Sequence, residues 1–236
     1  MSFTLGTTTA SQMTSRTGVV LEGLRSDILA GRRAPGERLP FAELVKDFRC
    51  SVGVLREALQ RLAEQGLVEC EVQQGFRVVR VSEHDLVELT TARCEIEVLA
   101  LRLAVEGGDV RWEASAVAAH HVLERTAMFD PEDVGRFSED WATNHARFHH
   151  SLLAGCSNRR ILSTATSLRD AAELYRRWSV PVGGDYGRDI AGEHRALMEA
   201  SVSHQTEEAC SLLRTHIQRT TDMLLPHVGQ DVSTAC

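Results

Sequence analysis

The sequence lacks the features that would place a protein in or across a membrane. It has no run of 18 or more apolar residues, so it predicts no membrane-spanning helix. The first fifteen residues, MSFTLGTTTASQMTS, contain neither a basic start nor a continuous apolar core, and we expect no signal peptide. The six cysteines are scattered without a CxxC pair, which favours reduced thiols. These absences predict a cytoplasmic protein without a membrane partner.

Motifs of several common enzyme classes are also missing. The chain contains no HExxH, GxSxG, P-loop or GxGxxG pattern. Internal repeats are absent, and the only biased tract is the Ser/Thr/Gly-rich start. We expect a disordered tail over residues 1–14 and a frayed one over 229–236. No enzyme class is indicated by a motif.

Charge is distributed unevenly along the 236 residues, whose net charge is −7. Residues 1–81 hold 11 basic against 9 acidic side chains, a net of +2, whereas residues 82–236 hold 15 against 24, a net of −9. The apolar fraction of 43% and the charged fraction of 25% are typical of a globular protein. We therefore predict two domains, over residues 15–81 and 82–228.

Residues 51–66, SVGVLREALQRLAEQG, contain the clearest local pattern. Ser51 can cap a helix through its side-chain oxygen, and Gly66 suits the left-handed residue that ends one. Between them, apolar residues recur at the spacing of one buried helix face. The stretch therefore predicts a helix with one apolar and one polar face.

The surrounding elements give this helix a context. Helices are predicted over 15–30 and 40–48, and residues 67–81 read as two strands that turn at Gln74 and Gly75. This order is that of a winged helix-turn-helix, whose second helix enters the major groove of DNA. The sequence predicts a DNA-binding regulator. The alternative is that 51–66 is a core helix of another fold.

The second half of the chain shows helical periodicity and no strand signal. Six helices are predicted, over 82–106, 109–129, 132–154, 158–178, 185–202 and 205–226. Such a bundle can hold a ligand site built from facing side chains. The fold class is therefore mainly α: a winged helix-turn-helix with a small β-hairpin, followed by an all-α six-helix bundle.

At this point the sequence resembles a known family. The segments ILAGRRAPGERL, LREAL, RLAEQGLV and QGFRV resemble the DNA-binding domain of the GntR family of bacterial regulators. The second half resembles the FCD effector domain of the FadR subfamily, in the six-helix, VanR-like branch. The segments that carry this likeness are Arg93-x-x-x-Glu97, HARFHHSLLAGCSN, EHRALMEA and LLRTHI.

The resemblance implies how DNA is contacted. The recognition helix of the family usually begins Ser-Arg-Thr-Pro-Val-Arg-Glu-Ala-Leu, and here Ser51 and Arg56 keep that pattern while Val52 and Gly53 replace the first Arg and the Thr. Arg38 matches the backbone-contacting Arg of the preceding loop. An Arg can donate two hydrogen bonds to guanine, whereas Val can only touch a thymine methyl. We therefore expect a different operator core or a lower affinity. Gly75 suits the tip of the wing, where a positive φ or a close approach to the sugar–phosphate backbone is needed, and we expect Gln74 and Gly75 to contact DNA there.

Four histidines have the spacing of a metal site. His145 and His149 stand at i and i+4 on one helix face, and His194 and His216 fall among apolar residues of two later helices. The alternative is that each is a separately hydrogen-bonded core histidine. The remaining histidines, including His120, have no partner spacing, and we expect them to face solvent.

The resemblance sharpens this prediction. FCD domains of this type hold a divalent metal with one Asp and three His, and His149, His194 and His216 match the three His positions. His145 stands at the Asp position, which replaces an oxygen ligand with a nitrogen and favours zinc, nickel or copper over magnesium or calcium. An anionic effector could then complete both the charge and the coordination.

Two further residues are candidates for effector binding. Arg93 offers a planar fork to a carboxylate, although a structural ion pair with Glu97 at i+4 is the alternative. Tyr175, Arg176 and Trp178 could line a cavity, although a Tyr/Trp stripe at helical spacing more often serves packing.

These patterns favour a homodimeric, metal-containing transcriptional repressor that binds double-stranded operator DNA and responds to a small carboxylate. One alternative is a regulator for which the metal itself is the signal. Another is a zinc-dependent hydrolase fused to a DNA-binding domain, since a three-histidine zinc with an open position can generate hydroxide.

Overall fold

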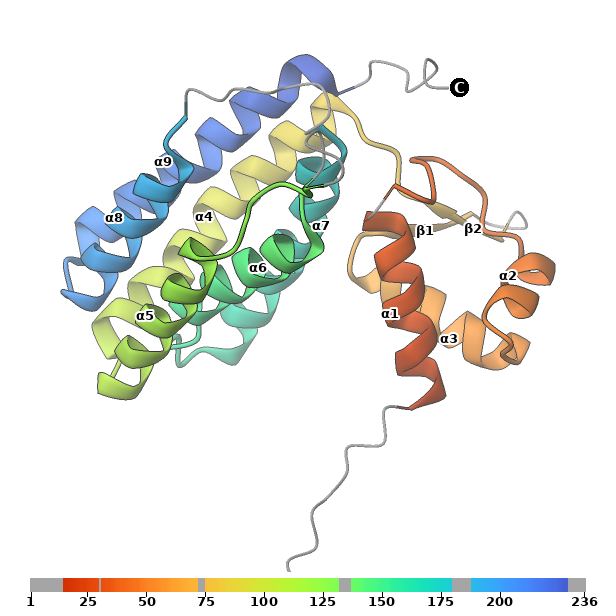
Figure 1. The fold of residues 1–236 in the computed structure, drawn as a ribbon, viewed down its shortest axis with the longest axis horizontal. Helices are drawn as coiled ribbons and strands as arrows, with labels where there is room; N and C mark the ends of the chain where they lie inside the picture. The colour runs from red at the N-terminus through yellow and green to blue at the C-terminus, as the bar shows by residue number, and fades with distance from the viewer. Residues whose placement is uncertain (1–14, 30, 72–74, 132–136, 180–187, 229–236) are drawn as a thin grey trace, which may run out of the picture.

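The computed structural model describes residues 15–29, 31–71, 75–131, 137–179 and 188–228 (Figure 1). Gln74 and both expected tails lie outside these ranges. Within them the fold is mainly helical, with one two-stranded antiparallel sheet, which confirms the predicted fold class. No helix of the described part combines the length and apolar character needed to cross a bilayer.

The N-terminal part, here called the head, is a winged helix-turn-helix. Its elements in chain order are α1 (Arg16–Leu29), α2 (Phe41–Asp47), α3 (Val52–Glu64), β1 (Val68–Glu71) and β2 (Gly75–Val78). The strands pair with Val68 opposite Val78, and Arg38 adds an isolated bridge to Arg77. Their apolar side chains form one cluster with those of the three helices.

Local chemistry sets the ends of α3. The Ser51 side chain accepts a hydrogen bond from the Val54 amide at 3.3 Å, which caps the helix as predicted. Gly66 has φ +72°, the left-handed conformation that ends the helix. In the turn before α3, Arg49 adopts φ +47°, and Arg16 donates to its carbonyl at 2.6 Å. Helix α1 thus hydrogen-bonds to the turn between α2 and α3.

Six helices form the bundle among the described residues: α4 (Glu83–Gly107), α5 (Val110–Glu124), α6 (Glu139–Leu153), α7 (Arg159–Ser179), α8 (Ile190–Val202) and α9 (Thr206–Leu224). The long helix α4 packs along α9 and α7, and α5 packs against α6 and α8 (Figure 1). Their apolar faces enclose one core cluster. The predicted number of bundle helices is confirmed.

Two of these helices are shorter than predicted. The helix expected over 109–129 ends at Glu124, and the one expected over 132–154 begins at Glu139. Ser138 explains the second difference, because its side chain accepts from the Trp141 amide at 3.0 Å and so caps α6. Phe129 and Phe137 pair as an isolated antiparallel bridge before that cap.

Helix α7 belongs to the bundle but also contacts the head. Leu174 is 1% exposed and packs in the cluster of the head rather than that of the bundle. Asp170, one turn earlier, accepts a hydrogen bond from Arg25 of α1 at 3.4 Å. Burial of a Leu side chain contributes about 1.5–3 kcal/mol, more than a partly exposed ion pair at about 0–1 kcal/mol. Leu174 therefore contributes more than the Arg25–Asp170 pair to the stability of the contact between α7 and the head. The division near residue 81 stays a prediction.

Candidate functional site

The four histidines singled out from the sequence meet inside the bundle. Helix α6 carries His145 and His149 on one face, α8 carries His194, and α9 carries His216. Their exposed fractions are 6%, 2%, 3% and 9%. One candidate ligand nitrogen from each lies within 4.8 Å of the others. The i and i+4 spacing thus placed two imidazoles on the face that the other helices cover.

The rings are packed against one another without enough hydrogen-bond partners. Ring centroids of His145 and His149 lie 4.6 Å apart, and those of His194 and His216 lie 4.9 Å apart. The Nε2 atoms of His149 and His194 approach to 3.3 Å. Nδ1 of His145 is buried with no hydrogen-bond partner in the described part of the chain. A buried nitrogen without a partner is costly.

Electrostatics keep these imidazoles neutral. Burial lowers the pKa of His145, His149 and His194 well below the usual range, and nearby Arg and His side chains lower it further. Burial also lowers the pKa of His216, against an opposing hydrogen bond to Glu193. A neutral imidazole presents a lone pair, which is the form that binds metal. The four side chains therefore fit a divalent ion with a preference for nitrogen ligands, such as zinc, nickel or copper.

Aromatic side chains surround the cluster. Trp141 stacks on the ring of His145 at a centroid distance of 4.8 Å, and the ring of Phe148 contacts that of His194 at 5.3 Å. Such an apolar shell limits the access of solvent to the site. His120, expected to face solvent, is instead 5% exposed and contacts Phe148 at 5.4 Å. That expectation was wrong because His120 shares a helix face with Ala116 and Leu123, which are both buried.

A cavity of about 80 Å³ adjoins the histidines. His145, His149 and His216 line it, together with four arginines: Arg93, Arg169, Arg176 and Arg188. Of these, Arg93 was proposed from the sequence as an effector anchor, and Arg176 was named beside Tyr175 as a residue that could line a cavity. Arg169 and Arg188 were missed because single arginines carry no spacing signature.

Arg93 both lines the cavity and forms the ion pair considered as its alternative role. Its Nε donates to Oε1 of Glu97 at 2.6 Å, and the pair is buried. Arg169 of α7 donates to the other carboxylate oxygen of Glu97 at 3.3 Å. One carboxylate thus serves two guanidinium groups, which leaves the cavity wall with an excess of positive charge.

Tyr175 lies elsewhere. It is 2% exposed and packs with Leu86 and Leu224 rather than lining the cavity. Its hydroxyl donates to Asp85 and accepts from the Ser82 amide. These bonds tie α7 to the start of α4, so the described contacts of Tyr175 are structural.

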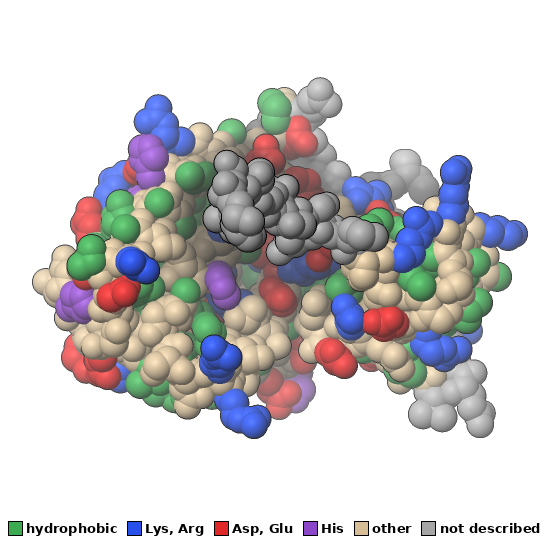
Figure 2. Space-filling model, turned by 90° about the horizontal axis from the view of Figure 1, so that it is seen from below, with side chains coloured by type: hydrophobic (Ala, Val, Ile, Leu, Met, Phe, Trp, Pro, Cys, Tyr) green, Lys and Arg blue, Asp and Glu red, His purple; other side chains and the backbone are tan. Residues whose placement is uncertain are grey.

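Except for Gln74, which lies outside the described residues, the residues expected to contact DNA lie on the head, where Lys and Arg side chains gather at its outer end (Figure 2). Ser51, Val52 and Gly53 at the start of α3 are exposed, and Val52 is 50% exposed. Arg56 is also exposed, with its guanidinium over the ring of Phe41 at 5.1 Å. These side chains are open to a partner.

Gly75 and Arg38 complete this face. Gly75 begins β2 with φ +87°, a conformation that suits a glycine at the wing. Arg38 is exposed beside the same hairpin. The exposed start of α3 and the hairpin are the parts of a winged helix that reach a duplex. The fold and this exposed face together therefore define a DNA-binding regulator with a winged helix-turn-helix.

Comparison with known proteins gives the family. Residues 17–78 match the family described as "Bacterial regulatory proteins, gntR family", and residues 88–219 match the FCD domain. The chain is 34% identical over 198 residues to the HTH-type transcriptional regulator BphR of Paraburkholderia xenovorans (strain LB400), covering 83% of this chain and 79% of that one. It is 31% identical over 198 residues to the HTH-type transcriptional repressor GlaR of Escherichia coli (strain K12), covering 82% and 89%.

Solved structures agree in fold. Escherichia coli McbR/YncC superposes with a TM-score of 0.74 at 21% identity, covering 91% of this chain and 99% of that one. A transcriptional regulator of the GntR type from Rhodococcus sp. RHA1 gives 0.67 at 26% identity, covering 91% and 99%. The chain belongs to the GntR family of bacterial transcriptional regulators and carries an FCD domain. The predicted resemblance is confirmed.

Proposed function

We propose that the protein is a homodimeric repressor whose operator affinity is controlled by a small carboxylate bound at a metal ion in the bundle. The observation that carries this proposal is the cluster of four buried histidines beside an arginine-lined cavity. A metal would occupy the lone pairs that otherwise face one another, and it would supply a cation to hold an anionic ligand. The printed name of GlaR, a repressor, supports the direction of control.

Charge in the cavity supports an anionic effector. Nη1 of Arg176 is buried and has no hydrogen-bond partner among the described residues, although Nη2 pairs with Glu173. The guanidinium also lies over the rings of Phe137 and Trp141, at 5.0 and 5.1 Å. An anchored guanidinium with one open donor is suited to a carboxylate oxygen. Arg93 and Arg176 are therefore the proposed effector anchors, and Tyr175, which the sequence also suggested, is not among them because it does not line the cavity.

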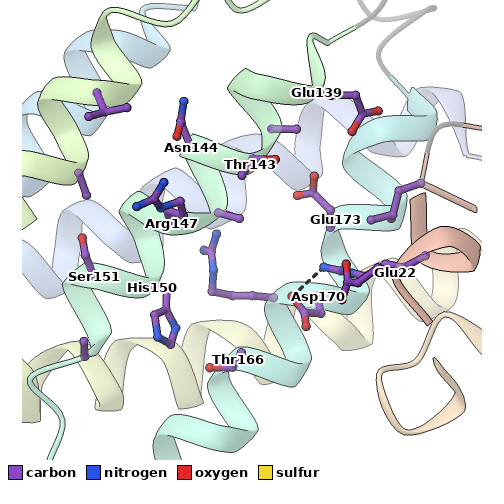
Figure 3. A pocket seen from close by; sticks show the side chains of 18 of the residues that line it. Glu22, Glu139, Thr143, Asn144, Arg147, His150, Ser151, Thr166, Asp170 and Glu173 are labelled. Atoms are coloured by element: carbon purple, nitrogen blue, oxygen red, sulfur yellow. Dashed lines mark hydrogen bonds and ion pairs between the residues drawn. The ribbon is translucent and has the colours of Figure 1, made fainter. Parts of the chain in front are cut away.

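Helix α7 offers a route from the cavity to the head. Arg169 and Glu173 line the cavity and also a cleft of about 830 Å³ between α1 and the bundle. Figure 3 shows Asp170 and Glu173 of α7 facing the same space as Glu22 of α1 and Arg147 of α6. An effector that draws Arg169 or Arg176 inward would move α7. Because Asp170 of α7 accepts a hydrogen bond from Arg25 of α1, this movement would reach the head. Control then requires the effector to prefer one placement of the head.

The proposed DNA contacts are those of Arg38, Ser51, Val52, Gly53, Arg56, Gln74 and Gly75. Val52 and Gly53 replace the Arg and Thr usual in the family, so we propose an operator that departs from the family's usual core or a weaker affinity for it. Selection of operators from random DNA tests this point. Recovery of the usual core, bound at full strength, would contradict it.

A specific observation also favours a second candidate, a regulator for which the metal is the signal. Four histidine nitrogens can fill a tetrahedral zinc site and leave no position for an effector. Elemental analysis of the purified full-length protein, joined to a thermal-shift screen of small carboxylates, separates the two candidates. If the protein is a carboxylate-responsive repressor, it should contain bound metal. At least one acid should then raise the melting temperature of the metal-loaded protein but not that of the metal-free protein. Bound metal with no stabilising acid would favour the second candidate.

A further inference from the structure

Glu193 on α8 contacts the histidine cluster from outside. It precedes His194, yet its side chain extends across to α9, where Oε2 lies 2.8 Å from Nδ1 of His216. This contact was not expected from the sequence, because neighbours on a helix point to different faces. Here both neighbours reach the histidine cluster. His194 belongs to the cluster itself, whereas Glu193 contacts it through Nδ1 of His216.

This contact identifies the tautomer of His216. A carboxylate only accepts hydrogen bonds, so Nδ1 of His216 must carry the proton for the 2.8 Å bond to form. Arg188 Nη2 lies 3.3 Å from the same Nδ1, but it is itself only a donor, and two donors cannot bond. The shorter contact decides the assignment. The lone pair of His216 is then on Nε2.

The Glu193 carboxylate is itself held in place. Arg188 contacts both of its oxygens, with Nε at 2.9 Å from Oε1 and Nη2 on Oε2. Arg219 donates to Oε1 at 3.0 Å. Arg188 is in turn fixed by the Thr220 hydroxyl at 3.1 Å. A carboxylate with this many donors cannot turn away from His216 without breaking several ion-paired contacts.

We propose that Glu193 is a positioning residue of the metal centre: it fixes His216 as the Nδ1–H tautomer, aims Nε2 at the ion and raises the basicity of that nitrogen. A carboxylate behind a ligating imidazole has this effect in metal sites generally. The inference rests on the proposed metal centre and deepens it. It assigns to Glu193, Arg188 and Arg219 a part in metal affinity that an ordinary ion-pair network would lack.

The first test needs no metal. In the full-length apo protein with ¹⁵N-labelled imidazoles, the ring nitrogen shifts report which nitrogen of each histidine is protonated, and a His216→Gln variant identifies the signals of that ring. We expect the Nδ1–H form in the wild type. In Glu193→Ala the signals should move toward the Nε2–H form. An Nε2–H ring in the wild type, or no change in the variant, would overturn the assignment.

The second test measures zinc affinity by competition with a chromophoric chelator. Removal of such a carboxylate weakens metal binding roughly 10- to 100-fold, and we expect this loss in Glu193→Ala. Glu193→Gln keeps an oxygen that can accept from Nδ1–H and should lose less, which also guards against a variant that fails to fold. The matched control is Glu199→Ala, an exposed residue on the same helix, which should bind zinc as the wild type does.

The outcomes separate this inference from the proposed function. Wild-type zinc affinity in Glu193→Ala would overturn the inference and leave the metal-dependent regulator intact. Absence of zinc, nickel and copper binding in the wild type would overturn both. Zinc binding with the expected loss in Glu193→Ala, but no carboxylate effect on the melting temperature, would support the inference and count against the carboxylate-responsive repressor.

Discussion

At the scale of single residues, the balance between burial and charge decides what the histidine cluster can do. Four imidazoles that are 9% exposed or less cannot all be protonated, because each would add an unpaired charge to the same small volume. The four imidazoles are therefore held in the neutral form, in which a ring nitrogen can donate its lone pair to a metal. Glu97 and the surrounding arginines provide charge nearby, but no described carboxylate belongs to the group of candidate ligand atoms.

Metal loading should therefore stabilise the fold. At a free zinc concentration about 100 times the dissociation constant, binding contributes about 2.7 kcal/mol, which raises the melting temperature of a chain of this size by about 5–10 °C. Differential scanning calorimetry with and without a chelator measures the shift. The shift should disappear in His149→Ala and persist in His150→Ala, an exposed neighbour on the same helix. A full zinc shift in His149→Ala would contradict the assignment of ligands.

The exposed start of α3 gives a second prediction. Val52 is 50% exposed, so Val52→Arg should fold normally. A bidentate Arg–guanine contact contributes about 1–3 kcal/mol of discrimination, so affinity for the family's usual operator core should rise roughly 5- to 150-fold. Fluorescence anisotropy with two labelled duplexes, the usual core and the selected operator, measures this. Equal affinities before and after the substitution would show that this position does not read bases.

Much of this residue-scale detail could be predicted from sequence spacing. His145 and His149 were found because a period of four places both on one face, and Arg93 was proposed because a guanidinium offers a planar fork to a carboxylate. Arg176 was named only as a possible cavity residue and Arg188 was not found, since their roles depend on which helices meet. His120 could have been recognised as buried from its register with Ala116 and Leu123.

At the scale of elements, α7 is the part of the chain that the sequence described least well. Its apolar residues predict a buried face, but periodicity cannot say which core receives each one. Leu174 enters the core of the head, and Asp170 pairs with Arg25, over a separation that no local pattern encodes. By contrast, Ser51 and Gly66 act within their own turns, so both ends of α3 could be predicted.

The contact between α7 and α1 should couple the two parts. Asp170→Asn removes one charge of a partly exposed pair, so stability should change by at most about 1 kcal/mol. The effect of metal and carboxylate on operator affinity should nevertheless fall, because α7 no longer restrains Arg25. Anisotropy titrations with and without ligands measure the response. Restored coupling in the charge-swapped variant Arg25→Asp with Asp170→Arg would support the pair, whereas an undiminished response in Asp170→Asn would exclude it.

At the scale of the whole molecule, a homodimer would explain how a head with little positive charge binds DNA. The head carries a net charge of only +2 over residues 1–81, a small excess for binding a phosphate backbone. Two heads side by side would double that charge and read two half-sites of one operator. Light scattering on the full-length protein should therefore give twice the chain mass of 26.1 kDa. A single-chain mass at micromolar concentration, with and without operator, would contradict the proposed homodimer.

If the histidine cavity of the bundle controls the DNA-binding head, the affinity for the operator must depend on what the cavity holds. The dissociation constant for the selected operator should be measured for apo protein, zinc-loaded protein and zinc-loaded protein with the stabilising carboxylate, in the wild type and in His149→Ala. We predict that the carboxylate weakens operator binding by at least fivefold in the zinc-loaded wild type and has no effect in His149→Ala. Identical constants in all three states of the wild type would contradict the account.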